Sequence, residues 1–198
     1  MTSAADAINK NLFLVKEHVG LFKAANNYDI YDPETGAMVM QCREDHLGLF
    51  TRIFRFSDYK RMTPFDIRIR TVEGDPVLRV TRGVTIFLSK VRVYDDKDEE
   101  IGGFREKMWS IGGKFEVLDP SGQAVCSLKG KWTGWEFAFV RDGVELARVT
   151  KKWAGLGKEL FTTADTYMLS ISPEVPPNST IRRLILAAVM CIDMVMKE

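Results

Sequence analysis

Apolar and polar residues alternate along short stretches of this chain, and residues that favour turns separate the stretches. The alternation is strict at 65–70, where Phe, Ile and Ile are interleaved with Asp, Arg and Arg. Upstream, residues 28–31 meet a turn containing Asp, Pro and Gly at 32–36 and continue as 37–42. A period of two is typical of strands with one wet face and one buried face. Similar pairs of stretches recur as far as residue 149 with no long helical pattern between them, which predicts an antiparallel meander.

Two pairs of adjacent glycines interrupt the alternation, at Gly102–Gly103 and Gly112–Gly113. One interpretation is a pair of bulges or tight bends, which help a sheet curl into a barrel. The other is a glycine-rich phosphate loop. Because neither a P-loop nor a GxGxxG pattern accompanies the glycines, we favour bulges.

The last segment has a different pattern. Three prolines lie between 173 and 177, and Asn, Ser or Thr at 178–180 can cap a helix that follows. From Leu184 to Ile192 no residue is polar, so the helix is apolar on all sides, as in a protein core or a membrane. Residues 184–196 would span about 20 Å, against roughly 30 Å of hydrocarbon, and Asp193 is costly at bilayer depth. We therefore predict a buried helix around which the sheet closes, although the closure itself is not visible in the sequence.

Composition places the chain among globular proteins and argues against several functions. Its 198 residues, 45% hydrophobic and 28% charged, suit one globular domain or two small ones, and we expect a single domain over residues 1–198. The formal net charge is +1, so we expect no binding to nucleic acid. Three separated cysteines predict reduced thiols, and the N-terminus lacks a secretory pattern, so we expect a cytoplasmic protein. No catalytic motif surrounds His18 or His46, so we expect no enzyme.

Two adjacent segments carry a family resemblance. Residues 145–155 read Glu-Leu-Ala-Arg-Val-Thr-Lys-Lys-Trp-Ala-Gly and resemble the phospholipid scramblase pattern of a strand leading to Lys-x-Trp-x-Gly. Residues 158–167 read Lys-Glu-Leu-Phe-Thr-Thr-Ala-Asp-Thr-Tyr and resemble the scramblase stretch that follows it. The hairpin at 28–36 and the apolar helix with an Asp near its end also match. LURP-one-related proteins, which share the tubby C-terminal-like superfamily, resemble the chain about as well.

This resemblance implies an all-β fold with one buried helix, in which a closed antiparallel barrel of about twelve strands surrounds the C-terminal helix. It implies a non-enzymatic, scramblase-like domain that associates with anionic membrane phospholipids, in the cytoplasm and peripheral on the membrane. The alternative is a soluble scaffold or small-ligand-binding module of LURP-one-related type without scramblase activity. The proline-rich tail and palmitoylated cysteines of scramblases do not occur in this sequence. The resemblance does not indicate a protein partner.

The calcium loop that the resemblance implies is degraded. Thr163 stands at the family's first acidic position, Thr166 replaces an Asn, and Asp165 remains. Calcium prefers several carboxylate and carbonyl oxygens in one short loop. We therefore expect no bound calcium, no other metal and no cofactor.

Basic residues interleaved with aromatic ones are the candidates for binding lipid headgroups. Between residues 52 and 70 the acids are Asp58 and Asp66, and the basic residues far outnumber them. One interpretation is a surface for anionic headgroups. The other is a solvated outer strand face over core aromatics. On the first interpretation, with the resemblance adding Lys-Lys before Trp153, the predicted headgroup-binding residues are Arg55, Lys60, Arg61, Lys151 and Lys152.

Overall fold

The computed structural model describes seven stretches of the chain, residues 4–17, 27–44, 63–83, 90–106, 115–131, 136–151 and 166–196. Two helices, α1 (Ala4–Ile8) and α3 (Thr180–Met196), flank a series of strands. The strands are β1 (Leu12–Glu17), β2 (Tyr28–Tyr31), β3 (Met38–Arg43), β4 (Phe65–Thr71), β5 (Pro76–Arg82), β6 (Lys90–Tyr94), β7 (Glu100–Glu106), β8 (Phe115–Leu118), β9 (Ala124–Lys131), β10 (Glu136–Arg141), β11 (Val144–Thr150) and β12 (Thr166–Ile171).

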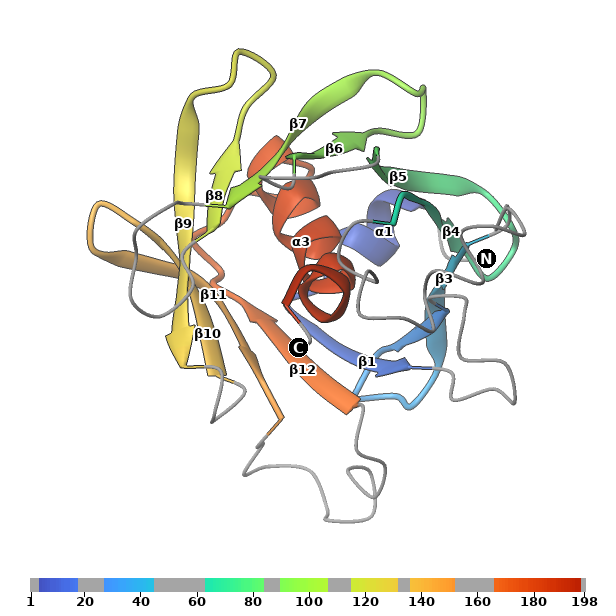
Figure 1. Ribbon diagram of the computed structural model, residues 1–198. Helices are drawn as coiled ribbons and strands as arrows, with labels where there is room; N and C mark the ends of the chain where they lie inside the picture. Colours follow the sequence, from blue (N-terminus) through green and yellow to red (C-terminus); the bar gives the residue numbers. More distant parts are fainter. Residues whose placement is uncertain are drawn as a thin grey trace.

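Each strand pairs in antiparallel fashion with the next one along the chain, and β1 pairs with β12 to close a barrel. The closing register sets Leu12 opposite Ser170 and Lys16 opposite Thr166. Helix α3 runs through the middle of the barrel (Figure 1). The predicted fold is therefore confirmed: an all-β, tubby-like barrel of twelve antiparallel strands surrounds the C-terminal helix.

The strict alternation at 65–70 produces the expected two faces of β4. Phe65, Ile67 and Ile69 are buried, whereas Asp66, Arg68 and Arg70 remain partly exposed. Hydrophobic side chains thus point to the core while charged ones line the outer wall. In this described part of the basic stretch, the arginines lie on an outer strand face over buried apolar residues, and headgroup binding there stays untested.

The apolar run of α3 is the centre of the core. Its residues Leu184–Met190 are all buried, which confirms the predicted buried helix as far as side chains are described. The first helical hydrogen bond runs from the Arg183 amide to the Ser179 carbonyl (3.3 Å), so Ser179 is the residue that caps the helix. Among the described residues, no helix has both the length and the apolar character needed to cross a bilayer.

Gly102 lies at a bulge between β6 and β7. Val93 pairs with Gly102 but Tyr94 pairs with Glu100, so one residue of β7 is extra. A Cβ atom on Gly102 would lie 2.1 Å from the Leu118 carbonyl oxygen and 3.2 Å from Cδ1 of Leu184 in α3. The bulge interpretation is confirmed for the first glycine pair, and Gly112–Gly113 lies outside the described residues.

Two of the three cysteines, Cys42 and Cys126, are buried, reduced thiols, as predicted. Burial raises the pKa of the Cys126 thiol to about 12. Such a thiol stays protonated and unreactive at neutral pH. Cys126 therefore behaves as a small core residue.

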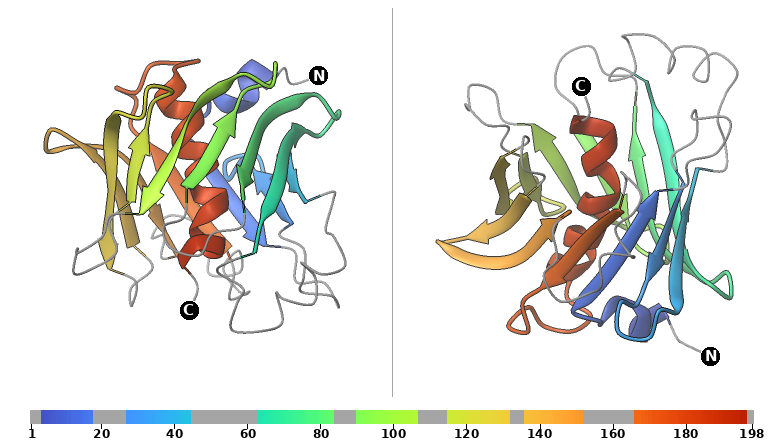
Figure 2. Two further views of the ribbon diagram at one scale, coloured as in Figure 1. Left: turned by 45° about the horizontal axis from the view of Figure 1, so that its top comes forward. Right: turned by 90° about the horizontal axis from the view of Figure 1, so that it is seen from below.

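Antiparallel order divides the connections between two ends of the barrel. We call one the turn end: it holds α1, the start of α3 and the six short segments 32–37, 72–75, 95–99, 119–123, 142–143 and 172–179. We call the other the connection end: there β1, β3, β5, β7, β9 and β11 finish, and α3 ends (Figure 2). The two ends differ in chemistry as well as in connection length.

Candidate functional site

Of the predicted headgroup-binding residues, the structure describes Lys151. Arg55, Lys60, Arg61 and Lys152 lie outside the described residues, as does Asp165. Lys151 directly follows β11 at the connection end. The segments that contain the other four connect β3 to β4 and β11 to β12, whose flanking strand ends lie at the same end. The binding role of all five residues stays a prediction.

Two lysines, one in β1 and one directly after β11, lie over aromatic rings. The Lys151 ammonium is 4.9 Å from the centre of the Tyr167 ring, and the Lys16 ammonium is 5.0 Å from that of Tyr31. The strands concerned, β11, β12, β1 and β2, are consecutive in the barrel. A cation over an aromatic face gains about 0.5–1 kcal/mol at an exposed site and keeps its charge. Tyr167 is the second residue of β12, so the Lys151 charge stays at the connection end, whereas Tyr31 is the last residue of β2 and draws the Lys16 charge toward the turn end.

A row of three arginines crosses the outer wall of β3, β4 and β5. Arg43 pairs directly with Arg68, and Arg68 pairs directly with Arg79. Like charges directly opposite each other on neighbouring strands repel. In the two outer arginines, Arg43 and Arg79, carboxylates compensate this repulsion.

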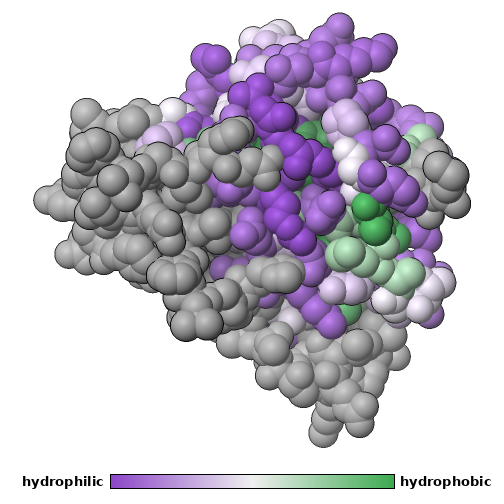
Figure 3. Space-filling view, turned by 90° about the vertical axis from the view of Figure 1, so that its right-hand side faces the viewer, coloured by the Kyte–Doolittle hydropathy of each residue, from purple (hydrophilic) through white to green (hydrophobic). Residues whose placement is uncertain are grey.

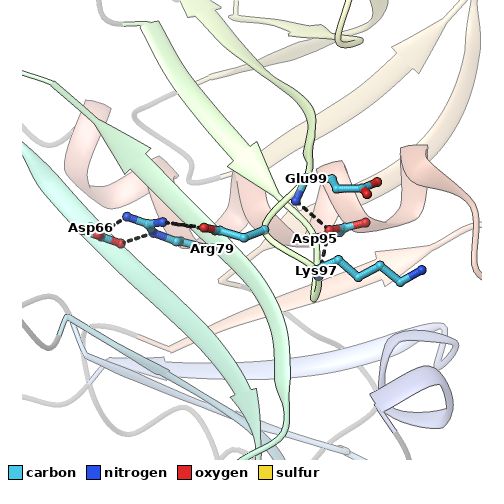
Figure 4. A network of polar contacts seen from close by, with 6 residues as sticks. Asp66, Arg79, Asp95, Lys97 and Glu99 are labelled. Atoms are coloured by element: carbon cyan, nitrogen blue, oxygen red, sulfur yellow. Dashed lines mark hydrogen bonds and ion pairs between the residues drawn. The ribbon is translucent and has the colours of Figure 1, made fainter.

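Arg43 and Arg79 each have acidic partners. The Arg43 guanidinium lies 2.6 Å from Asp29 and also donates to the backbone carbonyls of Tyr28 and Cys42. Arg79 donates to both oxygens of Asp66 at 3.0 and 2.8 Å (Figure 4). Arg79 also donates to both oxygens of Asp98. The hydrogen bonds to Asp66 and to Asp98 raise the pKa of the Arg79 guanidinium.

Arg68 differs from its neighbours in the row. In the part of the chain that the structure describes, Arg68 makes no hydrogen bond and no ion pair. Among the described residues its charge has no acidic partner, unlike the charges of Arg43 and Arg79 on either side. The side of the barrel that carries β3, β4 and β5 is largely hydrophilic where it is described, with one small hydrophobic patch (Figure 3). This wall is suited to polar contacts rather than to apolar docking.

A second arginine in β5, Arg82, points into the barrel at the connection end and is 4% exposed. It donates to the Thr63 carbonyl at 2.7 Å, and its guanidinium lies 4.8 Å from the centre of the Phe65 ring. A buried cation of this kind fixes the residues that lead into β4. It therefore helps to position the end of the segment that contains Arg55, Lys60 and Arg61.

The turn end has the opposite charge. The acidic residues are Asp32, Glu34, Glu73, Asp75, Asp95, Asp96, Asp98, Glu99, Asp119, Asp142 and Glu174, while Lys97 is the one basic residue in these six segments. Several of the carboxylates shape their turns. Asp95 accepts hydrogen bonds from the amides of Lys97 and Glu99 at 2.9 and 3.0 Å (Figure 4). Asp119 accepts in the same way from Gln123, and its hydrogen bond with Ser121 is the main cause of its lowered pKa.

Helix α3 is held at the turn end by two neighbouring arginines. Arg182 is 2% exposed and donates to the carbonyls of Lys10 and Val175 and to the Asn11 side chain, at 2.8, 2.9 and 2.9 Å. Burial lowers the pKa of this guanidinium. Arg183 is partly exposed and lies 3.5 Å from Asp96. Sequence reasoning missed this difference, because a helix that is apolar on all sides gives no signal of which arginine points inward.

Metal binding has no support from the described residues, among which no group of three His, Cys, Asp or Glu side chains converges. Asp165 and its neighbours are not among them. The expectation of little calcium binding is therefore untested and stays a prediction.

Comparison with known proteins gives one family and one structure. The model of the Scramblase family matches residues 10–198. A protein from Arabidopsis thaliana with a known X-ray structure superimposes with a TM-score of 0.53 at 14% sequence identity, over 98% of this chain and 99% of its own. At that identity the likeness shows the fold alone. A search of proteins with curated function gives no match.

Proposed function

This chain belongs to the scramblase family, and from that premise we propose that it is a non-enzymatic domain that associates with anionic membrane phospholipids. The observation that carries the proposal is the family match from residue 10 to the last residue. We place the protein in the cytoplasm, peripheral on the membrane. Arg55, Lys60, Arg61, Lys151 and Lys152 contribute the basic surface that meets the headgroups.

The sequences of the connections support this proposal. All four tryptophans, Trp109, Trp132, Trp135 and Trp153, fall in segments that join strands at the connection end. The six segments of the turn end contain no aromatic residue. Tryptophan is enriched where proteins meet the boundary between lipid and water. Aromatic and basic residues therefore occur together in the connections of one end.

The magnitude of the expected attraction is sufficient for binding. A basic residue near an anionic membrane contributes on the order of 1 kcal/mol, so several acting together produce a measurable affinity. This attraction is electrostatic and weakens as added salt shortens the screening length to about 8 Å near physiological ionic strength.

The experiment is co-sedimentation with phosphatidylserine vesicles of the wild-type protein, a Lys60→Glu, Arg61→Glu variant and a Lys151→Glu, Lys152→Glu variant. We expect each double reversal to weaken binding by well over tenfold, because each changes the local charge by four. Circular dichroism controls for folding, and phosphatidylcholine vesicles control for non-specific sedimentation. If wild-type protein binds and neither reversal matters, the assigned residues are wrong.

The second function class, a soluble scaffold or small-ligand module of LURP-one-related type, makes the opposite prediction. Such a module would stay in the supernatant with both kinds of vesicle at low and moderate salt. That result would replace the membrane proposal with this alternative.

A further inference from the structure

We propose that the barrel meets the membrane with its connection end and that its turn end points away from the lipid. This orientation rests on the proposed function, since it presupposes binding to an anionic surface. The observation behind it is a separation of charge along the barrel axis, which a net charge of +1 conceals.

The turn end would be repelled by anionic lipid. Every charged residue in its six segments other than Lys97 is acidic. Several of these carboxylates are exposed, with 63% of the Asp98 side chain and 44% of the Asp96 side chain accessible. Some lie close to cations, as Asp98 does to Arg79 and Asp96 to Arg183. The acidic residues of these six segments nevertheless far outnumber the basic ones, so this end carries an excess of negative charge.

The connection end lacks the acidic excess of the turn end: among the terminal residues of its described strands, three are acidic and four are basic, namely Glu17, Glu106, Glu136, Arg43, Arg82, Lys90 and Lys131. Lys90, the first residue of β6, pairs in register with Arg105 of β7, so two cations lie side by side on the wall. Lys90 is exposed, and within the described ranges it makes no ion pair. Arg105 is half exposed and has Glu116 as a partner at 2.7 Å. Lys151 adds another positive charge directly after β11.

The distance between the ends makes the separation effective. A strand of seven residues, such as β5, is roughly 23 Å long at about 3.3 Å per residue, and strand tilt shortens its axial span to about 18 Å. The screening length near physiological salt is about 8 Å, so a membrane at one end scarcely senses charges at the other. The dipole of α3 opposes this polarity, but a helix end carries only about half a charge, far less than the excess of carboxylates.

A matched pair of single substitutions tests the orientation. Lys90 and Lys97 are both exposed lysines without an ion pair in the described structure, and they lie at opposite ends of the barrel. Figure 4 shows the Lys97 side chain extending away from Asp95. Lys90→Glu and Lys97→Glu change the net charge by the same amount, and neither removes a core contact.

The measurement is the affinity of each variant for phosphatidylserine vesicles in moderate salt. We expect Lys90→Glu to weaken binding roughly thirty-fold, as a reversal of one charge that meets the surface, and Lys97→Glu to change it less than twofold. Equal losses, a larger loss for Lys97→Glu, or no loss in either variant would overturn the orientation while leaving membrane binding in place. If wild-type protein itself fails to bind, the proposed function fails and the orientation fails with it.

Discussion

Replacing Gly102 with alanine tests the contact between the barrel wall and the central helix. The new Cβ would lie 2.1 Å from the Leu118 carbonyl oxygen, a backbone atom that cannot move without disturbing β8. It would also lie 3.2 Å from Cδ1 of Leu184 in α3. Overpacking of this kind costs about 1–3 kcal/mol. The φ of +141° adds about 1–3 kcal/mol of backbone strain for a residue with a side chain.

Together these effects predict a loss of about 2–6 kcal/mol, a large share of the 5–15 kcal/mol by which domains are typically stable. The matched control is Gly122→Ala in the turn between β8 and β9. Gly122 also has a positive φ, +84°, but nothing lies within 4 Å of the position that a Cβ atom would take there. The control therefore introduces backbone strain alone, about 1–2 kcal/mol.

The assay is urea unfolding followed by far-ultraviolet circular dichroism, with the slope m checked for constancy between variants. We expect the Gly102→Ala midpoint to fall far below that of Gly122→Ala, or the Gly102→Ala protein not to accumulate as a folded species. Equal midpoints for the two variants would refute the reasoning, because they would show that the wall does not pack closely at Gly102.

Three further predictions concern the helix and calcium. Ala188→Asp, at a position 6% exposed, should unfold the protein by burying an unpaired carboxylate, and a stable variant by circular dichroism would count against the buried helix. Arg182→Met should lower the free energy of unfolding in urea by about 3–5 kcal/mol, because it leaves buried carbonyl acceptors unpaired. Arg183→Met should lower it by about 1 kcal/mol or less, and equal losses for the two variants would contradict the assigned roles. Isothermal titration should detect no micromolar calcium binding, since Thr163 replaces the family's acidic residue, and such binding would show that expectation to be wrong.

The sequence was sufficient for features that depend on local periodicity. Alternation at 65–70 predicted the two faces of β4, and the unbroken apolar run predicted the burial of Leu184–Met190. The glycine pair at 102–103 predicted a bulge because glycine tolerates a backbone that other residues avoid. Each of these inferences needs only a few neighbouring residues.

Features that depend on the exact register between strands could not be predicted. The row of Arg43, Arg68 and Arg79 depends on how three strands pair, and the pairing of β4 with β5 shifts at a bulge next to Arg70. Burial of Arg182 rather than Arg183 depends on the oxygens that Lys10 and Asn11 present from the other end of the chain. The opposite charges of the two barrel ends appear only when the turns are assigned to one end.

The central claim is that the barrel binds anionic phospholipid surfaces through a basic surface. The most direct measurement is the binding of wild-type protein to vesicles as the phosphatidylserine fraction rises from zero, at low and at moderate salt. We predict no binding to pure phosphatidylcholine, binding that increases with the phosphatidylserine fraction, and a marked loss of affinity with added salt. Protein that remains in the supernatant at every phosphatidylserine fraction, even in low salt, would contradict the claim.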